Sequence, residues 1–268
     1  RHAALPEYPT IGPEHNHQGI LEECIYDCSV EGPRERRMFV YLPAEYYDTT
    51  AHYPVFYLLH GARGNETSWI EKGNLLHNID SLTTHGLMEK SIVVLPNTNQ
   101  HRSDRDYGKS RIKGAIESFF ENDGMVEYAF VSDVVSHVDS VYRTIPEKSA
   151  RAIGGLSIGA LQSIHITANH PDMFDYVGLF SAAIYPGRNA ASPVYQDMDG
   201  KLKAQFAKKP SLYWIGIGKT DFLYRDNERF RKQLDSAHHP YEYFENEDGH
   251  IWKNWRIYLT EFAPKLFK

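Results

Sequence analysis

The sequence predicts an α/β fold in which a mostly parallel, doubly wound sheet of about eight strands is covered by helices on both faces. Short, almost continuously apolar runs alternate along the chain with segments of helical periodicity, as in parallel strands that are buried on both sides. The first two expected strands instead alternate polar and apolar residues on either side of a turn, which indicates an antiparallel hairpin at one edge. A chain of 268 residues is long enough to form one such domain.

The expected elements follow one another without an internal repeat or a linker that would divide the chain. The expected strands are 20–30, 36–42, 55–59, 92–95, 150–154, 176–180, 212–215 and 241–244. The expected helices are 74–85, 129–142, 158–169, 227–236 and 251–262. Residues 1–18 are rich in proline and polar groups, so we expect a flexible N-terminal tail followed by a single domain over residues 19–268.

Two segments, 97–123 and 185–209, fit this alternation poorly because they are polar and long for the loops of a compact α/β unit. Each follows the carboxyl end of an expected strand, which is the end of such sheets where ligands bind. They are either functional loops or surface insertions without a role in binding.

Composition excludes several kinds of partner. The formal net charge is −6 and the basic residues are not clustered, which argues against nucleic acid and anionic membranes. No apolar run approaches the roughly 20 residues that span a bilayer. The chain begins with Arg1 rather than methionine, which is compatible with a cleaved leader, so we expect secretion or a periplasmic location, with the cytoplasm as the alternative.

Cys24 and Cys28 are the two cysteines of the chain. Four residues along a strand place their Cα atoms about 13 Å apart, which is beyond the roughly 7 Å limit for a disulfide. Both are therefore predicted to be free thiols with structural roles. A zinc site would need further ligands near them, and no metal site is expected.

The strongest chemical signal is Gly155-Leu-Ser157-Ile-Gly159, which lies between an apolar run and a helical segment. It fits the nucleophile elbow, in which a serine occupies a strained turn and the flanking glycines let strand and helix pass closely. The alternative is an ordinary turn in which Ser157 caps the following helix.

A nucleophilic serine needs a base and an acid that orients the base, and in proteins with this elbow they follow in the order Ser, Asp or Glu, His. His250 is the expected base because it comes after the last expected strand, beside Gly249. Asp221 is the expected acid because it follows the preceding strand. The rival histidines are His165, His170, His238 and His239, and the rival acids are Asp226 and Asp248.

Two backbone N–H groups must also stabilise the oxyanion that forms during acyl transfer. One is expected from Ile158, directly after the serine, and the other from Ala62, in the loop after the expected strand 55–59. His60, at the start of that loop, is expected to hold the loop rather than to take part in the chemistry.

Several stretches occur in an order that is typical of one superfamily. They are His60-Gly61, Gly64-Asn-Glu-Thr-Ser-Trp69, Ala152-Ile-Gly-Gly-Leu-Ser-Ile-Gly159, His170-Pro-Asp-Met-Phe174, Phe180-Ser181, Gly218-Lys-Thr-Asp221 and Gly249-His-Ile-Trp252. From about residue 20 to the C-terminus the chain resembles the esterase D-like α/β-hydrolases. Within them it is most similar to carbohydrate esterase family one, the feruloyl and acetylxylan esterases.

This resemblance implies an α/β-hydrolase fold, a catalytic triad of Ser157, Asp221 and His250, and an oxyanion hole formed by the amides of Ala62 and Ile158. The family usually has methionine after the serine and a second glycine after the motif, where this chain has Ile158 and Ala160. Both departures keep the backbone donors, so they bear on substrate choice more than on mechanism.

The functional expectation is therefore a serine carboxylic ester hydrolase that needs no cofactor and acts on a small-molecule or polysaccharide-linked ester. Feruloyl or acetyl groups on plant polysaccharide are the expected substrates. The alternatives are a thioester hydrolase of the S-formylglutathione type and a non-catalytic, carbohydrate-binding homologue. Expected substrate contacts are Arg63, Tyr107, Tyr185 and Trp252, although aromatic residues at these positions are equally compatible with ordinary packing.

Overall fold

The computed structural model describes residues 18–30, 34–99, 123–187 and 190–268. Its centre is an eight-stranded sheet with the order β1-β2-β4-β3-β5-β6-β7-β8. The strands are β1 (Ile20–Asp27), β2 (Glu35–Leu42), β3 (Val55–Leu59), β4 (Ile92–Leu95), β5 (Arg151–Leu156), β6 (Tyr176–Phe180), β7 (Leu212–Gly218) and β8 (Glu242–Asn246). β2 pairs antiparallel with β1 and with β4, and all other pairs are parallel. The prediction of a mostly parallel sheet with an antiparallel edge is confirmed.

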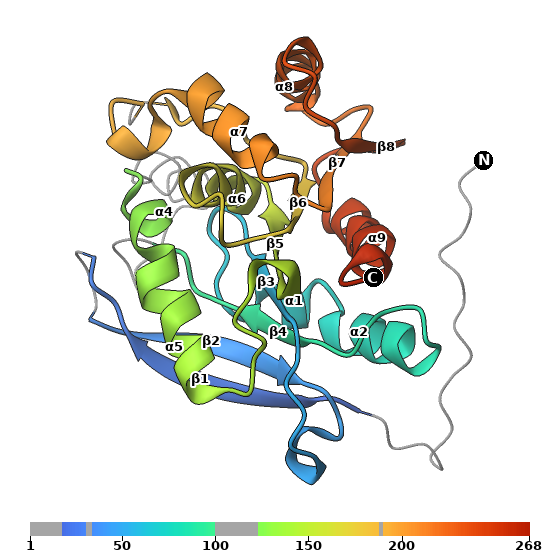
Figure 1. The fold of residues 1–268 in the computed structure, drawn as a ribbon. Coiled ribbons are helices and arrows are strands. Elements are labelled where there is room, and N and C mark those ends of the chain that lie inside the picture. Colours follow the sequence, from blue (N-terminus) through green and yellow to red (C-terminus); the bar gives the residue numbers. More distant parts are fainter. Residues whose placement is uncertain (1–17, 31–33, 100–122, 188–189) are drawn as a thin grey trace, which may run out of the picture.

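Helices cover both faces of the sheet (Figure 1). The first face packs against α1 (Ser68–Glu71), α2 (Leu75–Thr84) and α9 (Trp252–Phe262). The opposite face packs against α4 (Met125–Phe130), α5 (Ser136–Val141), α6 (Ile158–Asn169), α7 (Met198–Ala207) and α8 (Tyr224–Ser236). Short turns of 3-10 helix lie at Tyr46–Asp48, Lys148–Ala150, Pro193–Tyr195 and Ala263–Lys265.

Burial explains why the central strands are apolar along their whole length. Every residue of β3, β4, β5, β6 and β7 is buried, because helices shield both of their faces. The edge strands β1 and β8 instead include exposed positions. Because β3, β5, β7 and β8 run parallel, their carboxyl ends lie at one rim of the sheet, where the loops that follow them can approach one another.

Some expected elements differ from those observed. The expected helix 129–142 begins earlier, at Met125, and contains a π-helical turn at Val131–Val135 between α4 and α5. The expectation of a loop or insertion over 185–209 is wrong for its second half, which forms α7. In α7 only Leu202, Gln205 and Phe206 are buried, and Gly200 interrupts the helical pattern, so the apolar stripe that predicts a helix is weak.

Three expectations fall on residues outside those described: most of the tail 1–18, most of the segment 97–123, and the substrate contact Tyr107. The single domain over 19–268 stays a prediction. The cysteine prediction is confirmed, since Cys24, on β1, and Cys28, just after it, are both free thiols.

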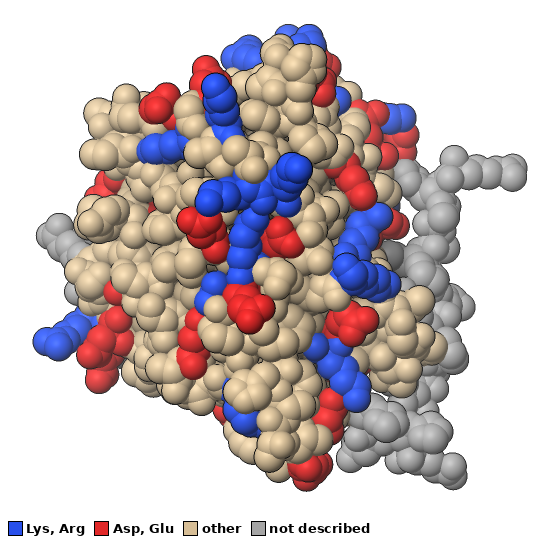
Figure 2. Space-filling view, in the orientation of Figure 1, with Lys and Arg blue, Asp and Glu red and all other residues tan. Residues whose placement is uncertain are grey.

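Charged side chains of both signs are interspersed on the face of the molecule shown in Figure 2. Ion pairs in the described residues include Lys148 with Asp175 and Lys208 with Asp172. Within the described ranges, no helix combines the length and the apolar character that crossing a membrane requires.

Candidate active site

Ser157 occupies a strained turn between β5 and α6. Its backbone angles are φ 55° and ψ −112°, a left-handed region that residues with a side chain rarely adopt. A Cβ added to Gly155 would lie 2.8 Å from the carbonyl oxygen of Leu59, and one added to Gly159 would collide with the carbonyl oxygen of His60. The side chain of Ser157 forms no capping hydrogen bond with α6. The turn therefore has the elbow geometry rather than that of an ordinary serine cap.

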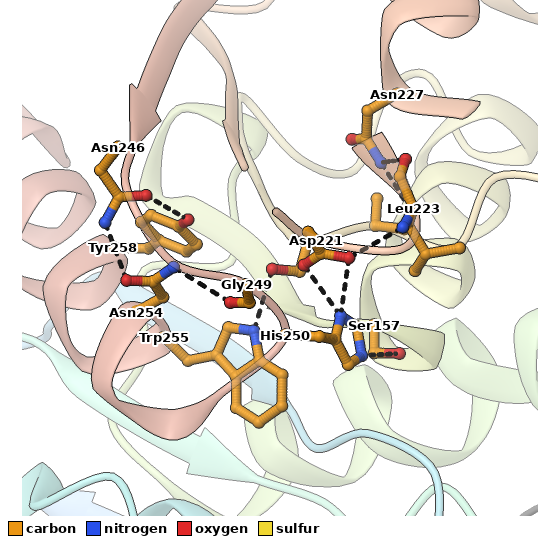
Figure 3. Close-up of polar contacts among 12 residues, drawn as sticks. Ser157, Asp221, Leu223, Asn227, Asn246, Gly249, His250, Asn254, Trp255 and Tyr258 are labelled. Atoms are coloured by element: carbon orange, nitrogen blue, oxygen red, sulfur yellow. Dashed lines mark hydrogen bonds and ion pairs between the residues drawn. The ribbon is translucent and has the colours of Figure 1, made fainter. Parts of the chain in front are cut away.

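Three side chains from separate loops form a continuous chain of hydrogen bonds (Figure 3). Ser157 Oγ lies 3.0 Å from Nε2 of His250. Nδ1 of His250 lies 3.0 Å and 3.2 Å from the two carboxylate oxygens of Asp221. Since an ionised carboxylate only accepts, Nδ1 carries the proton and Nε2 is left to accept from the serine hydroxyl.

The sheet explains why these residues meet. Ser157 follows β5, Asp221 follows β7 and His250 follows β8, and these strands lie close together in the order β5-β6-β7-β8. Of the candidate bases and acids, His250 and Asp221 are the pair joined to Ser157 by these hydrogen bonds.

The rival residues lie elsewhere in the fold. His165 is buried within α6, the Nδ1 of His170 bonds the carbonyl of Ile166, and His239 stacks on Phe206. Asp226 lies in the first turn of α8. Asp248 forms an ion pair with Lys253 at 2.8 Å.

The carboxylate of Asp221 is fully buried and kept ionised by its surroundings. Burial by itself opposes the charge, but hydrogen bonds from His250, from the Leu223 N–H at 2.9 Å and from the Ser181 hydroxyl outweigh it and lower the pKa of Asp221. An ionised carboxylate at this position can orient the imidazole and stabilise the imidazolium that forms during proton transfer.

Ser181 is a part of this arrangement to which sequence reasoning assigned no role. It directly follows β6, is fully buried, and has a positive φ of 47°. Its Oγ accepts a hydrogen bond of 3.0 Å from Nε1 of Trp255. The indole of Trp255 packs edge-on against the ring of His250, with centroids 5.0 Å apart. The signal in the sequence was the pair Phe180-Ser181, which belongs to the family resemblance.

The loop that carries His250 is held by α9 (Figure 3). The side-chain amide of Asn254 donates to the carbonyls of Glu247 and Gly249, each at 3.0 Å. Asn254 in turn accepts from Asn246, which accepts from the hydroxyl of Tyr258. This network ties the residues directly before the histidine to the helix that follows it.

The expected oxyanion donors lie on the elbow and on the loop beside it. Ile158 is the first residue of α6, so its N–H has no acceptor within the helix. The loop after β3 makes a turn in which the Gly64 N–H bonds the Gly61 carbonyl at 3.1 Å. There is no room for a side chain at Gly61 against Leu156, so the turn that carries Ala62 lies directly against the elbow.

His60 fixes this turn and is electrically neutral. It is buried, and burial lowers its pKa to about 4. Its Nδ1 lies 2.7 Å from the Gly61 carbonyl, and its Nε2 accepts from the Thr98 N–H at 2.9 Å. These contacts hold the loop, as the sequence predicted.

The expected substrate contacts have different surroundings. Arg63 follows Ala62 with a positive φ of 63°, and its Nε is buried without a hydrogen-bond partner among the described residues. Tyr185 lies after β6 and is 43% exposed. Trp252 packs its ring between Trp69 and Trp255, with both centroids 5.1 Å away, which is a packing role.

Within the described part of the chain, no group of three or more His, Cys, Asp or Glu side chains could hold a metal ion.

Comparison with known proteins identifies the family. The sequence profile described as "Putative esterase" matches residues 29–266. The chain belongs to this esterase family. The chain is 28% identical over 236 residues to an endo-1,4-beta-xylanase/feruloyl esterase of Xylanibacter ruminicola, covering 85% of this chain and 29% of the relative. It thus spans less than a third of that relative's length.

Solved structures show the fold. A ferulic acid esterase from the anaerobic fungus Anaeromyces mucronatus superposes with a TM-score of 0.79 at 20% identity, covering 98% of this chain and 96% of the fungal chain. An S-formylglutathione hydrolase from Staphylococcus aureus superposes with a TM-score of 0.72 at 19% identity, covering 95% and 98%. The α/β-hydrolase fold is confirmed, and family membership supports carboxylic ester hydrolysis as the chemistry.

Proposed function

We propose that this esterase is a serine hydrolase that releases feruloyl or acetyl groups from plant polysaccharide through an acyl-enzyme on Ser157. The observation that carries the proposal is the unbroken chain of hydrogen bonds from Asp221 through His250 to the serine hydroxyl. A serine at the tip of a strained elbow, joined to an oriented imidazole, is what nucleophilic acyl transfer requires.

In the first half of the proposed reaction, Ser157 Oγ attacks the ester carbonyl carbon while its proton passes to Nε2 of His250. The carbonyl electron pair moves to oxygen, where the N–H groups of Ala62 and Ile158 stabilise the negative charge. When the tetrahedral intermediate collapses, the bond to the alcohol oxygen breaks, and His250 gives its proton to the leaving alcohol.

In the second half, water replaces the alcohol. Nε2 of His250 takes a proton from water as the water oxygen attacks the acyl carbon, and the same donors hold the oxyanion. Collapse of this intermediate releases the carboxylic acid and returns the proton to Ser157. Asp221 keeps Nδ1 protonated throughout, so the imidazole presents the same nitrogen to both alcohol and water.

The acyl group is proposed from the relatives. The Xylanibacter relative is named as a xylanase/feruloyl esterase, and the Anaeromyces structure as a ferulic acid esterase. A plant polysaccharide lies outside the cell that degrades it, so we also propose that the protein is exported from the cytoplasm.

Thioester hydrolysis is the second candidate, favoured by the similarity to the Staphylococcus S-formylglutathione hydrolase structure. A serine triad could cleave either bond. Ester and thioester hydrolysis are distinguished by measuring kcat/KM with methyl ferulate, acetylated xylan and S-formylglutathione. The proposal requires kcat/KM to be highest for one of the two oxygen esters.

The experiment that tests catalysis itself is covalent labelling. A fluorophosphonate should label the wild-type protein at Ser157, while Ser157→Ala should be folded, unlabelled and inactive on p-nitrophenyl acetate. A wild-type protein that takes up no label would instead favour the non-catalytic, carbohydrate-binding alternative.

A further inference from the structure

Phe222 is an exposed aromatic residue next to the candidate triad. It directly follows Asp221, and at 76% it is the most exposed of the large hydrophobic side chains in the described residues. Isolated apolar residues are common on protein surfaces, so exposure alone indicates little. The position of Phe222 within the site makes it informative.

The local fold turns Phe222 outward. Asp221 before it is buried against His250, and the N–H of Leu223 after it bonds the Asp221 carboxylate. The side chain of Leu223 packs inward on a small apolar cluster that includes Ile158. With both neighbours directed inward, the ring between them is left in solvent.

The ring of Phe222 lies against His250. Their centroids are 4.7 Å apart and the planes meet at 64°. Ile251, on the other side of His250 in the sequence, is 45% exposed. The imidazole that would protonate the leaving alcohol is therefore bordered by accessible apolar surface.

Sheet order places this surface on the leaving-group side. The turn with Ala62 follows β3 and the loop with Phe222 follows β7, and these strands lie on opposite sides of β5, which carries Ser157. In the proposed intermediate the oxyanion points toward the β3 side. The alcohol oxygen must be within reach of His250, which lies toward β7 and β8.

We propose that Phe222 forms a subsite for the alcohol part of the ester, on which the apolar C–H face of a sugar ring packs beside His250. This inference rests on the proposed function and specifies its substrate. An open aromatic face suits a sugar ring, because one face of the sugar loses water while its hydroxyl groups stay hydrated. It also leaves room for the remainder of a polysaccharide to extend into solvent.

The test uses ferulic or acetic acid, whichever of the two acyl groups the wild-type protein releases faster. Two esters of that acid are compared, the methyl ester and a xylo-oligosaccharide ester. The readout is the ratio of kcat/KM for the sugar ester to kcat/KM for the methyl ester. Phe222→Ala and Phe222→Leu should lower this ratio about tenfold, while Phe222→Trp, which keeps an aromatic face, should hold it within about threefold of wild type.

The matched control is Tyr128→Ala, which removes another highly exposed aromatic side chain, 71% exposed on α4, and should leave the ratio at the wild-type value. If Phe222→Ala lowers both kcat/KM values in proportion, the residue acts by holding His250 and the subsite is refuted. A ratio that does not change in any Phe222 variant also refutes it. Failure of the proposed function is distinct, since wild type would then show no Ser157-dependent turnover of either ester.

Discussion

The carboxylate of Asp221 is buried completely, yet it lies 3.0 Å from Nδ1 of His250 and accepts two further hydrogen bonds. A buried carboxylate is costly unless its oxygens are satisfied, and here the fold supplies three donors. The acid is thus held in its charged form without access to water, which suits a group that must orient an imidazole through every proton transfer.

Asp221→Asn should lower kcat on p-nitrophenyl acetate by roughly 10⁴-fold, because an amide can donate to Nδ1 and favour the wrong imidazole tautomer. Asp226→Asn is the matched control, since Asp226 lies five residues further on in the first turn of α8, and it should stay close to wild type. Steady-state rates of both variants decide the assignment, and a large loss in Asp226→Asn alone would move the acid.

Ser181→Ala should impair catalysis through Asp221 rather than through substrate contact. Removing one hydroxyl donor leaves the negative charge of the carboxylate less stabilised, so the hydrogen-bonded pair of Asp221 and His250 binds a proton more readily. Activity should therefore be lost at a pH about one unit higher on the acid side, and kcat should fall about tenfold. The check is the pH profile of kcat/KM.

The control for Ser181 is Ser91→Ala. Ser91 is also buried and lies before β4, with its hydroxyl bonded to the Glu89 carbonyl. An unshifted acid limb in Ser181→Ala, at whatever level of activity, would show that Ser181 has only a structural role.

Glu127 should make the protein less stable as the pH rises. It is fully buried on α4, bonds the hydroxyl of Tyr195, and burial raises its pKa to about 7 from an ordinary 4.5. Between pH 4.5 and about pH 7, Glu127 therefore keeps its proton in the folded state and loses it in the unfolded chain. Its contribution to stability is complete below pH 4.5 and is lost as the pH rises through 7.

The measurement is the free energy of unfolding of wild type and Glu127→Gln at pH 5 and pH 8. Glutamine cannot ionise, so the stability of the variant relative to wild type should increase between these pH values by on the order of 3 kcal/mol. Glu147→Gln, at an exposed position, serves as the control. Parallel pH curves for wild type and Glu127→Gln would contradict a neutral buried acid.

The parts of the fold that depend on burial were predicted well from the sequence. Strands 55–59, 92–95 and 176–180 have the expected bounds, because both of their faces are covered and their residues are uniformly apolar. Helix Met198–Ala207 was missed because it buries few apolar side chains. Its packing on α6 is a tertiary contact that local pattern does not encode.

The part of the site that could be predicted is the part that follows the order Ser, Asp, His along the chain. The three residues of the candidate triad could be predicted because strand ends meet at one rim of the sheet. The position of Ser181 in the site could not be predicted, since it depends on a positive φ and on contacts with Asp221 and Trp255, which are distant in sequence. The exposure of Phe222 was also unpredictable, because it results from both neighbours turning inward.

Gly159→Ala should be severely destabilising, although alanine is ordinarily the better helix former. A Cβ there would collide with the carbonyl oxygen of His60 and crowd Leu59, and backbone atoms of a buried parallel strand cannot move aside. We expect a loss of about 3 kcal/mol or more in the free energy of unfolding, together with loss of activity as Ser157 shifts. Gly86→Ala is the comparison without a steric clash, because Gly86 has a positive φ of 68° but nothing within 4 Å of its added Cβ. Backbone strain alone should cost only about 1 kcal/mol there. Urea unfolding of both variants gives the comparison, and a Gly159→Ala protein as stable as Gly86→Ala would show that strand and helix do not pass as closely as the elbow requires.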